Sequence, residues 1–110
     1  MQSRTIGDVR VLDWSGRITH GEETIALRQA LRDLVQEGAR KIVLNLGGVN
    51  YIDSSGIGEL VAAYTSVTNL GGQLKLLNLT KRIRELLAIT KLLTVFDVYD
   101  SESAAVASFK

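Results

Sequence analysis

The sequence predicts one α/β domain, in which about four helices flank a central, mostly parallel mixed sheet of about five strands. Two observations carry this prediction. Short apolar runs of strand length alternate along the chain with longer segments whose apolar residues recur every three or four positions, which is typical of βαβ units. At 110 residues the chain can bury only one hydrophobic core, so we expect residues 1–110 to form a single domain.

The first extended segments lie near the start of the chain. Residues 9–14 alternate between apolar and polar side chains in a strand pattern. Gly16 comes next, and residues 17–20 form a second short extended piece that ends in a turn at Gly21. Because no helix separates these two strands, we expect them to pair antiparallel at one side of the sheet.

The first helix is predicted over residues 22–37. Glu22 and Glu23 lie in its first turn, where the helix dipole favours acidic side chains, and Gly38 is a natural stop. The apolar stripe that this helix would bury comprises Leu27, Ala30, Leu31, Leu34 and Val35.

The middle of the chain is predicted as a strand, a connection and a second helix. Residues 41–46 form a short apolar run that suits a strand covered on both faces. Residues 47–53 are predicted as a connection. Ser54 or Ser55 would then cap a helix that ends near Asn69, before two glycines.

The last third repeats the alternation. Residues 73–78 are predicted as a strand, and Thr80 as the cap of a helix that runs to about Ile89. Residues 95–99 would form the last strand, and residues 101–109 a terminal helix.

Composition excludes several classes of function. Thirteen basic and twelve acidic side chains give a net charge of +1, so the basic field that drives nucleic-acid binding is absent. Without cysteine the chain forms no disulfide or thiolate metal site, and its single histidine, His20, excludes a multi-histidine metal site. No apolar run reaches the ~20 residues of a membrane span, and residues 1–11 lack a secretory signal. We therefore expect a soluble intracellular domain, with no metal, membrane or nucleic-acid partner.

The densest functional signal lies at the start of the second helix. This helix would bury Ile57, Leu60, Val61, Tyr64 and Val67. Ser55 projects on a different line, which continues through Gly58, Ala62 and Ser66 with Thr65 alongside, and only Glu59 interrupts this small, nearly uncharged face. Such a face suits docking by another protein better than it suits solubility alone.

The two adjacent serines have a structural and a functional interpretation. Serine and aspartate are favoured helix caps, worth about 1 kcal/mol, and Gly56 could simply relax a tight turn. One hydroxyl suffices for capping, however, which leaves the second available. A hydroxyl at a helix N-terminus is well placed to hold a phosphate, because free N–H groups and the dipole stabilise the anion.

Two other interpretations are weaker. A serine hydrolase could be assembled from Ser55, His20 and Asp53, but the chain has no Gly-x-Ser-x-Gly elbow. A basic cluster near residue 82 is expected to be a solvated helix face and not a nucleotide site, since no Gly-rich phosphate loop is present. That cluster comprises Lys81, Arg82 and Arg84.

The start of the second helix and its surroundings resemble a known protein family. Residues 52–58 (Ile-Asp-Ser-Ser-Gly-Ile-Gly), which come after the apolar run 42–46, resemble the phosphorylation segment of STAS domains, and in particular of bacterial anti-sigma-factor antagonists. The resemblance includes residues 16–19 and 70–76 and continues into the segment 83–101. It therefore spans nearly the whole chain and implies the STAS-like α/β sandwich.

The resemblance implies a cytoplasmic binding module that is a kinase substrate and not an enzyme. The unphosphorylated form would bind an anti-sigma factor, usually itself a serine kinase, and so free a sigma factor. That kinase would hold ATP in trans and phosphorylate the second serine, Ser55, and a serine phosphatase would reverse the reaction. No cofactor of the chain itself is implied, and a monomer or weak dimer is expected.

The resemblance also assigns roles to single positions. Asp53 and Ser54 would shape the turn, while two glycines keep the backbone accessible. The chain departs from the family at Thr19, where an acid is frequent, and at Lys91, where glycine is common. The residues expected to contact the partner are Thr19, Asp53, Ser54, Gly56 and Gly58, together with Ala62, Thr65 and Ser66, which follow from helical spacing alone.

One alternative within the family stays open. STAS domains also serve as scaffold subunits of stress-sensing assemblies and as accessory subunits of transporters. A scaffold would need self-association, whereas the antagonist would stay a monomer or weak dimer until its kinase is present.

Overall fold

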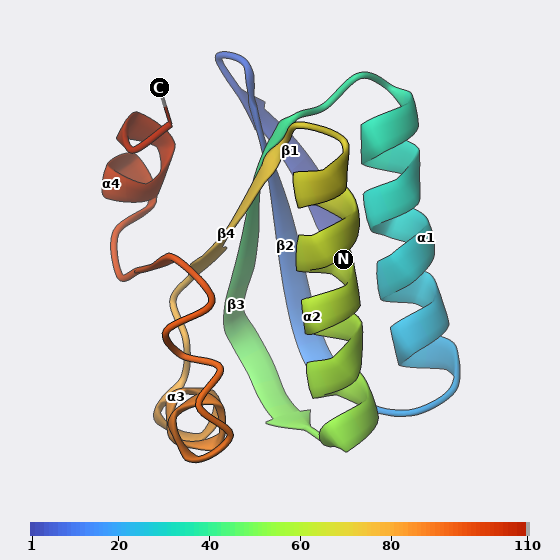
Figure 1. The fold of residues 1–110 in the computed structure, drawn as a ribbon, viewed down its shortest axis with the longest axis vertical. Helices are drawn as coiled ribbons and strands as arrows, with labels where there is room; N and C mark the ends of the chain where they lie inside the picture. Colours follow the sequence, from blue (N-terminus) through green and yellow to red (C-terminus); the bar gives the residue numbers. More distant parts are fainter. Residues whose placement is uncertain (110) are drawn as a thin grey trace.

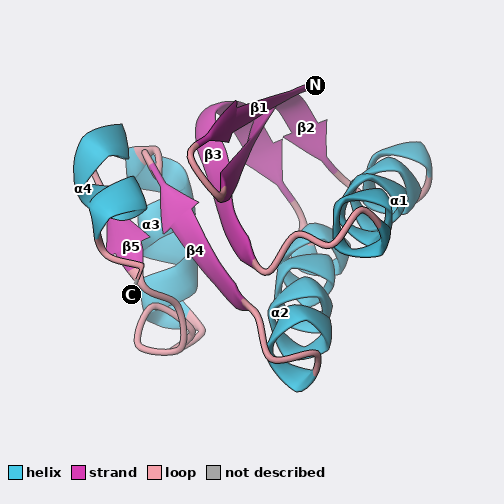
Figure 2. Ribbon diagram, turned by 90° about the horizontal axis from the view of Figure 1, so that it is seen from above, coloured by secondary structure: helices cyan, strands magenta, loops and turns pink. Residues whose placement is uncertain are grey.

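The computed structural model describes residues 1–109 and confirms the α/β prediction. In chain order the elements are β1 (Gln2–Ile6), β2 (Val9–Ile18), α1 (Glu22–Gln36), β3 (Lys41–Ile52), α2 (Ser54–Asn69), β4 (Gln73–Leu77), α3 (Lys81–Ile89), β5 (Val98–Tyr99) and α4 (Glu102–Ala107). The strands form one sheet in the order β1-β2-β3-β4-β5, in which β1 is antiparallel to β2 and the remaining pairs are parallel (Figures 1 and 2).

Two unequal cores flank the sheet. Helices α1 and α2 lie side by side along one face, and α4 lies on the other side (Figures 1 and 2). The larger core joins the sheet to α1, α2 and α3, with Leu44, Leu60 and Leu87 among its fully buried members. The smaller core, under α4, comprises Val9, Val11, Val43, Leu77 and Ala105.

The N-terminal prediction is corrected in two ways. The two strands predicted over 9–14 and 17–20 form the single strand β2, because Gly16 continues it at a register shift with a φ of 88°. The antiparallel edge pair exists, but its partner is β1, which the sequence analysis missed. Strand β1 is an exposed edge without an apolar alternation, and its register is set by a two-residue turn beginning at Gly7, whose φ is 61°.

Strand β3 is longer than predicted. Segment 47–52, predicted as a connection, continues the strand to Ile52. Two glycines conceal the strand pattern there, and one of them is required by close packing. A Cβ at Gly48 would lie only 2.9 Å from the Ser15 Cβ on the neighbouring strand. The extension leaves a single residue, Asp53, between β3 and α2.

The remaining elements match the predictions, apart from their lengths. Thr80 caps α3, its Oγ1 accepting from the Ile83 N–H at 3.3 Å. Strand β5 spans two residues instead of five, pairing with β4 only at Leu76 and Leu77. Helix α4 is shorter than predicted and is capped by Ser101.

Candidate functional site

The site is built around the single residue that joins β3 to α2. Asp53 has an extended backbone, and its Oδ1 accepts from the Gly56 N–H at 2.8 Å. Its Oδ2 accepts from the His20 N–H at 3.1 Å, which ties the β2–α1 turn to the start of α2. The prediction that Ser54 or Ser55 caps α2 is therefore wrong, because the carboxylate one residue earlier fills that role.

The same hydrogen bonds fix the charge of Asp53. The N–H groups of Gly56 and His20 hold the pKa of its carboxyl below the ordinary value, since they stabilise the charged form. The cap is therefore an anion at neutral pH. Both serine hydroxyls are left without a capping role.

Ser55 lies at an open surface. Its side chain is half-exposed and that of Ser54 is exposed, and within residues 1–109 neither hydroxyl has a hydrogen-bond partner. Ser55 lines a depression of about 540 Å³ between the first turns of α1 and α2. Its other lining residues are His20, Gly21, Thr24, Ile25, Arg28, Gly58, Glu59 and Ala62.

Gly56 and Gly58, in the first turns of α2, differ in the space around their Cβ positions. A Cβ at Gly56 would collide with the Ile18 carbonyl oxygen and lie 2.6 Å from Ile52 Cγ1, so only glycine lets α2 start this close to the sheet. At Gly58 an added Cβ would meet nothing within 4 Å. Gly58 therefore adds no side-chain atom to the surface beside Ser55.

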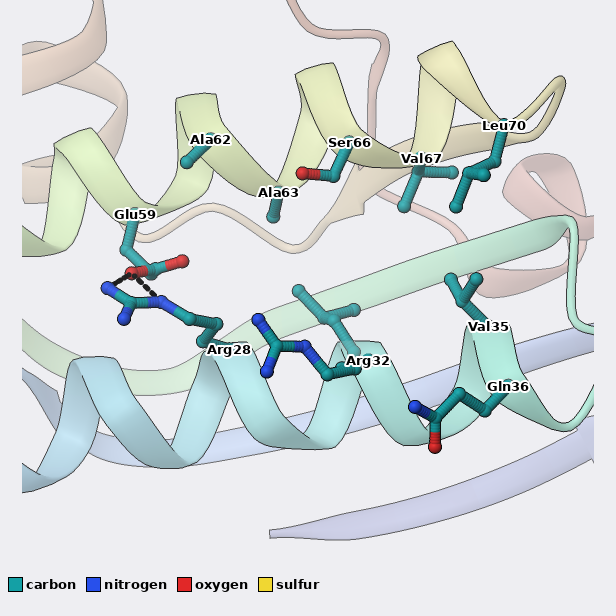
Figure 3. A pocket seen from close by; sticks show the side chains of 11 residues that line it. Arg28, Arg32, Val35, Gln36, Glu59, Ala62, Ala63, Ser66, Val67 and Leu70 are labelled. Atoms are coloured by element: carbon teal, nitrogen blue, oxygen red, sulfur yellow. Dashed lines mark hydrogen bonds and ion pairs between the residues drawn. The ribbon is translucent and has the colours of Figure 1, made fainter.

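The other predicted contact residues divide into two groups. Ala62 shares the depression with Ser55, and Ser66 continues the same face into a second depression of about 240 Å³ between α1 and α2 (Figure 3). Thr65 is exposed but lines neither depression, and its hydroxyl donates to the Val61 carbonyl at 2.9 Å.

Thr19, one of the two departures from the family pattern, also forms a side-chain hydrogen bond. Its Oγ1 donates to a Glu23 carboxylate oxygen at 2.5 Å. Thr19 immediately precedes His20, whose backbone N–H holds the Asp53 cap. Thr19 therefore orders the turn beside the site, and its hydroxyl is already committed.

One ion pair at the site is not predicted by the sequence pattern. Glu59, expected to interrupt an otherwise uncharged face, is only 6% exposed. Its Oε1 accepts from Arg28 Nη2 at 2.7 Å and Nε at 3.1 Å across the α1–α2 boundary (Figure 3). An acidic residue on a face of small side chains was the available signal, but its partner depends on how the two helices lie together.

The geometry does not support a hydrolase. His20 reaches Asp53 through its backbone N–H and not through its imidazole. Within residues 1–109 the Ser55 hydroxyl makes no hydrogen bond to that ring. The three residues therefore do not form a catalytic triad, in which hydrogen bonds link a nucleophile, a base and an orienting acid.

The basic cluster of α3 is a surface feature. Lys81 and Arg82 are exposed, and the Arg82 guanidinium lies 5.2 Å from the centre of the Tyr51 ring. Arg84 pairs with Asp100 at 3.2 Å. In the part of the chain that the structure describes, no helix is long and apolar enough to cross a membrane.

Comparison with known proteins gives a consistent result. Residues 1–105 match the family model described as the STAS domain. The chain is 34% identical over 84 residues to the candidate anti-sigma factor antagonist BtrV of Bordetella bronchiseptica, covering 76% of this chain and 72% of that protein. It is 39% identical over 72 residues to the anti-sigma-B factor antagonist of Bacillus subtilis, covering 66% of this chain and 65%, just under two thirds, of that relative.

A solved structure has the same fold. The crystal structure of TM1081, a candidate anti-sigma factor antagonist from Thermotoga maritima, superposes with a TM-score of 0.88. The two sequences are 25% identical, and the match covers 96% of this chain and 91% of that one.

Proposed function

The chain belongs to the STAS domain family, and from this premise we propose that it is an anti-sigma factor antagonist, a binding module and not an enzyme. In its unphosphorylated form it binds an anti-sigma factor that is also a serine kinase, and so frees a sigma factor in the cytoplasm. The kinase holds ATP and phosphorylates Ser55, which releases the complex. A serine phosphatase restores the binding form.

One observation carries this proposal. Ser55 presents a hydroxyl that has no hydrogen-bond partner among residues 1–109, at the N-terminal end of α2, on a surface that another protein can reach. Asp53 already caps the helix, so no structural task is left for that hydroxyl. The names of the curated relatives support the assignment of the partner class.

The helix end suits a phosphorylated side chain. Phosphorylation adds about −1.5 to −2 charge units at the positive end of the α2 dipole. The dipole stabilises such a charge by up to ~2 kcal/mol, partly offset by repulsion from the Asp53 carboxylate. We therefore expect little refolding on phosphorylation.

The switch acts at the interface. A partner surface that fits a bare hydroxyl supplies no cation of its own for the new phosphate, and desolvating such a charge in the interface costs several kcal/mol. The affinity should therefore fall by roughly 100-fold or more. Ala62 and Ser66 extend the docking face from Ser55 along α2, and Gly58 adds no side chain to it.

The proposal is tested on the chain purified from its own cells, with and without phosphatase treatment, by mass spectrometry of the peptide that contains residue 55. We expect a phosphopeptide modified at Ser55 that phosphatase removes. The Ser54→Ala variant should keep the label, and Ser55→Ala should lose it. Labelling that survives in Ser55→Ala, or no phosphate at this residue under any growth condition, would contradict the proposal.

The proposal also predicts the oligomeric state. Without its kinase, the antagonist should elute from size-exclusion chromatography as a monomer or weak dimer. Stable higher assemblies of the chain alone would favour the scaffold role instead.

A further inference from the structure

The ion pair between Arg28 and Glu59 is unequally exposed. The Glu59 side chain is 6% exposed, whereas that of Arg28 is 56% exposed. Both hydrogen bonds of the pair use one carboxylate oxygen of Glu59 and two nitrogens of the Arg28 guanidinium. An almost buried anion is thus compensated by a cation that stays largely in solvent and, within residues 1–109, has further N–H donors without a partner.

This pair lies next to the proposed phosphorylation site. Ser55 and Glu59 are four residues apart on α2, which places their side chains on one face, about 5–6 Å apart at Cβ. Gly58 contributes no side chain to that face, and its Cβ position is open space. Ser55, Gly58, Glu59 and Arg28 all line the same depression.

A phosphate on Ser55 would change the charge balance of this depression. It would add a second anion beside Glu59, and Asp53 supplies a third at the helix start. Among residues 1–109, Arg28 is the only lysine or arginine that lines the depression, and His20 is its only histidine. A guanidinium can bind phosphate oxygens through two parallel N–H donors, which makes Arg28 the natural counter-ion.

We propose that Arg28 is the intramolecular receiver of the Ser55 phosphate, and that it weakens its bond to Glu59 when it pairs with the phosphate. This inference rests on the proposed function, because it takes Ser55 as the acceptor. Phosphorylation then does two things at the docking face: it adds an anion, and it draws Arg28 out of its arrangement with Glu59. The unphosphorylated face presents the Arg28–Glu59 pair intact to the partner.

The test measures the second ionisation of the phosphate in the full chain, with phosphoserine incorporated at position 55 during translation. A 31P NMR titration gives the pKa of that step, about 6 for an unperturbed phosphoserine. Because Arg28→Met alone leaves a buried carboxylate unpaired and could destabilise the fold, the comparison uses Glu59→Gln as background. Arg28→Met/Glu59→Gln is the test variant, and Arg32→Met/Glu59→Gln is the charge-matched control, one helical turn further along α1.

Loss of Arg28 should raise this pKa by about one unit relative to Glu59→Gln, since a paired cation favours the dianion. The Arg32 control should leave the pKa nearly unchanged. Equal pKa values for the Arg28 and Arg32 variants would overturn the inference. A structural role of Arg28 alone would lower the unfolding temperature without moving the phosphate pKa.

The outcome separates this inference from the function on which it rests. Phosphoserine incorporated during translation needs no kinase, so the titration reports on Arg28 alone. If Ser55 is phosphorylated in cells but the phosphate pKa does not depend on Arg28, only the proposed role of Arg28 is refuted. If the pKa depends on Arg28 but cells never label Ser55, the proposed function falls.

Discussion

Helices α2 and α3 begin in nearly the same way and yet do different things. Each starts within a few residues of a strand, and each is capped by an acceptor side chain. Asp53 accepts from the third helical residue of α2 at 2.8 Å, and Thr80 does so in α3 at 3.3 Å. The capping physics is therefore shared by the two helix starts.

The difference lies in the first turn beyond the cap. In α3 the next residues are Lys81 and Arg82, and the Arg82 guanidinium is placed over the Tyr51 ring. Cations at the positive end of a helix dipole are mildly unfavourable, and this ring contact offsets part of that cost. In α2 the next residues are two serines whose hydroxyls make no hydrogen bond in the described part of the chain, beside an open depression. The first turn of α2 therefore stays small, uncharged and open, whereas that of α3 is charged and packs on a ring.

The largest expected effect is at Gly56, which has no counterpart in α3. Gly56→Ala should lower the free energy of unfolding by about 3 kcal/mol, because the new methyl group would collide with Ile18 and Ile52. Urea unfolding followed by circular dichroism measures it. The control is Gly58→Ala, which should stabilise the chain by about 0.5–1 kcal/mol, since it removes a helical glycine in open space. Equal effects of the two substitutions would refute this account of the α2 start.

The cap of α3 should matter for stability alone. Thr80→Ala should cost about 1 kcal/mol in urea unfolding, because it removes the acceptor of the Ile83 N–H. It should leave the phosphorylation level of Ser55 unchanged at a temperature where the variant is folded. A change in that level would mean that the two helix starts are coupled.

The smallest expected effect is a pH dependence of stability, which should be present for the Asp53 cap of α2 and absent for the Thr80 cap of α3. The pKa of Asp53 is lowered in the folded chain, so its charged form contributes stability above the unfolded pKa of about 3.9. That contribution is lost as the pH falls through the lower, folded pKa. The stability difference between the unsubstituted chain and Asp53→Asn should therefore be largest at neutral pH and shrink below about pH 4.

Thr80→Ala is the matched control for this titration, because a hydroxyl cap does not ionise in this range. Its stability difference from the unsubstituted chain should be the same at pH 7 and pH 3. If the Asp53→Asn difference were equally constant, the cap of α2 would not depend on the carboxylate charge.

Sequence patterns identified the cap of α3 and misplaced that of α2 for one reason. Thr80 has no cap residue next to it, since Leu79 and Lys81 flank it, whereas Asp53, Ser54 and Ser55 are adjacent and compete at the other helix start. Which of the three caps α2 depends on where β3 ends, and glycines at 47 and 48 hide the continuation of that strand. Ser55, proposed from the sequence as the acceptor, lies at the surface, and only the structure shows that Asp53 caps the helix in its place.

Other features were beyond single-sequence patterns. Strand β1 is an exposed edge, so it carries little of the apolar alternation by which strands are recognised. The pairing of Arg28 with Glu59 joins residues 31 positions apart and depends on the packing of α1 against α2. Helix spacing places residues on a face, but it does not say which side chain of a neighbouring helix meets them.

The central claim is that phosphorylation of one hydroxyl, at Ser55, controls association with the anti-sigma factor kinase. Isothermal titration calorimetry with the purified kinase measures it most directly, using the unmodified chain and the chain with phosphoserine at residue 55. We predict that the phosphorylated chain binds roughly 100-fold more weakly or not at all, while the two forms have the same circular dichroism spectrum. Equal affinities of the two folded forms would contradict the account.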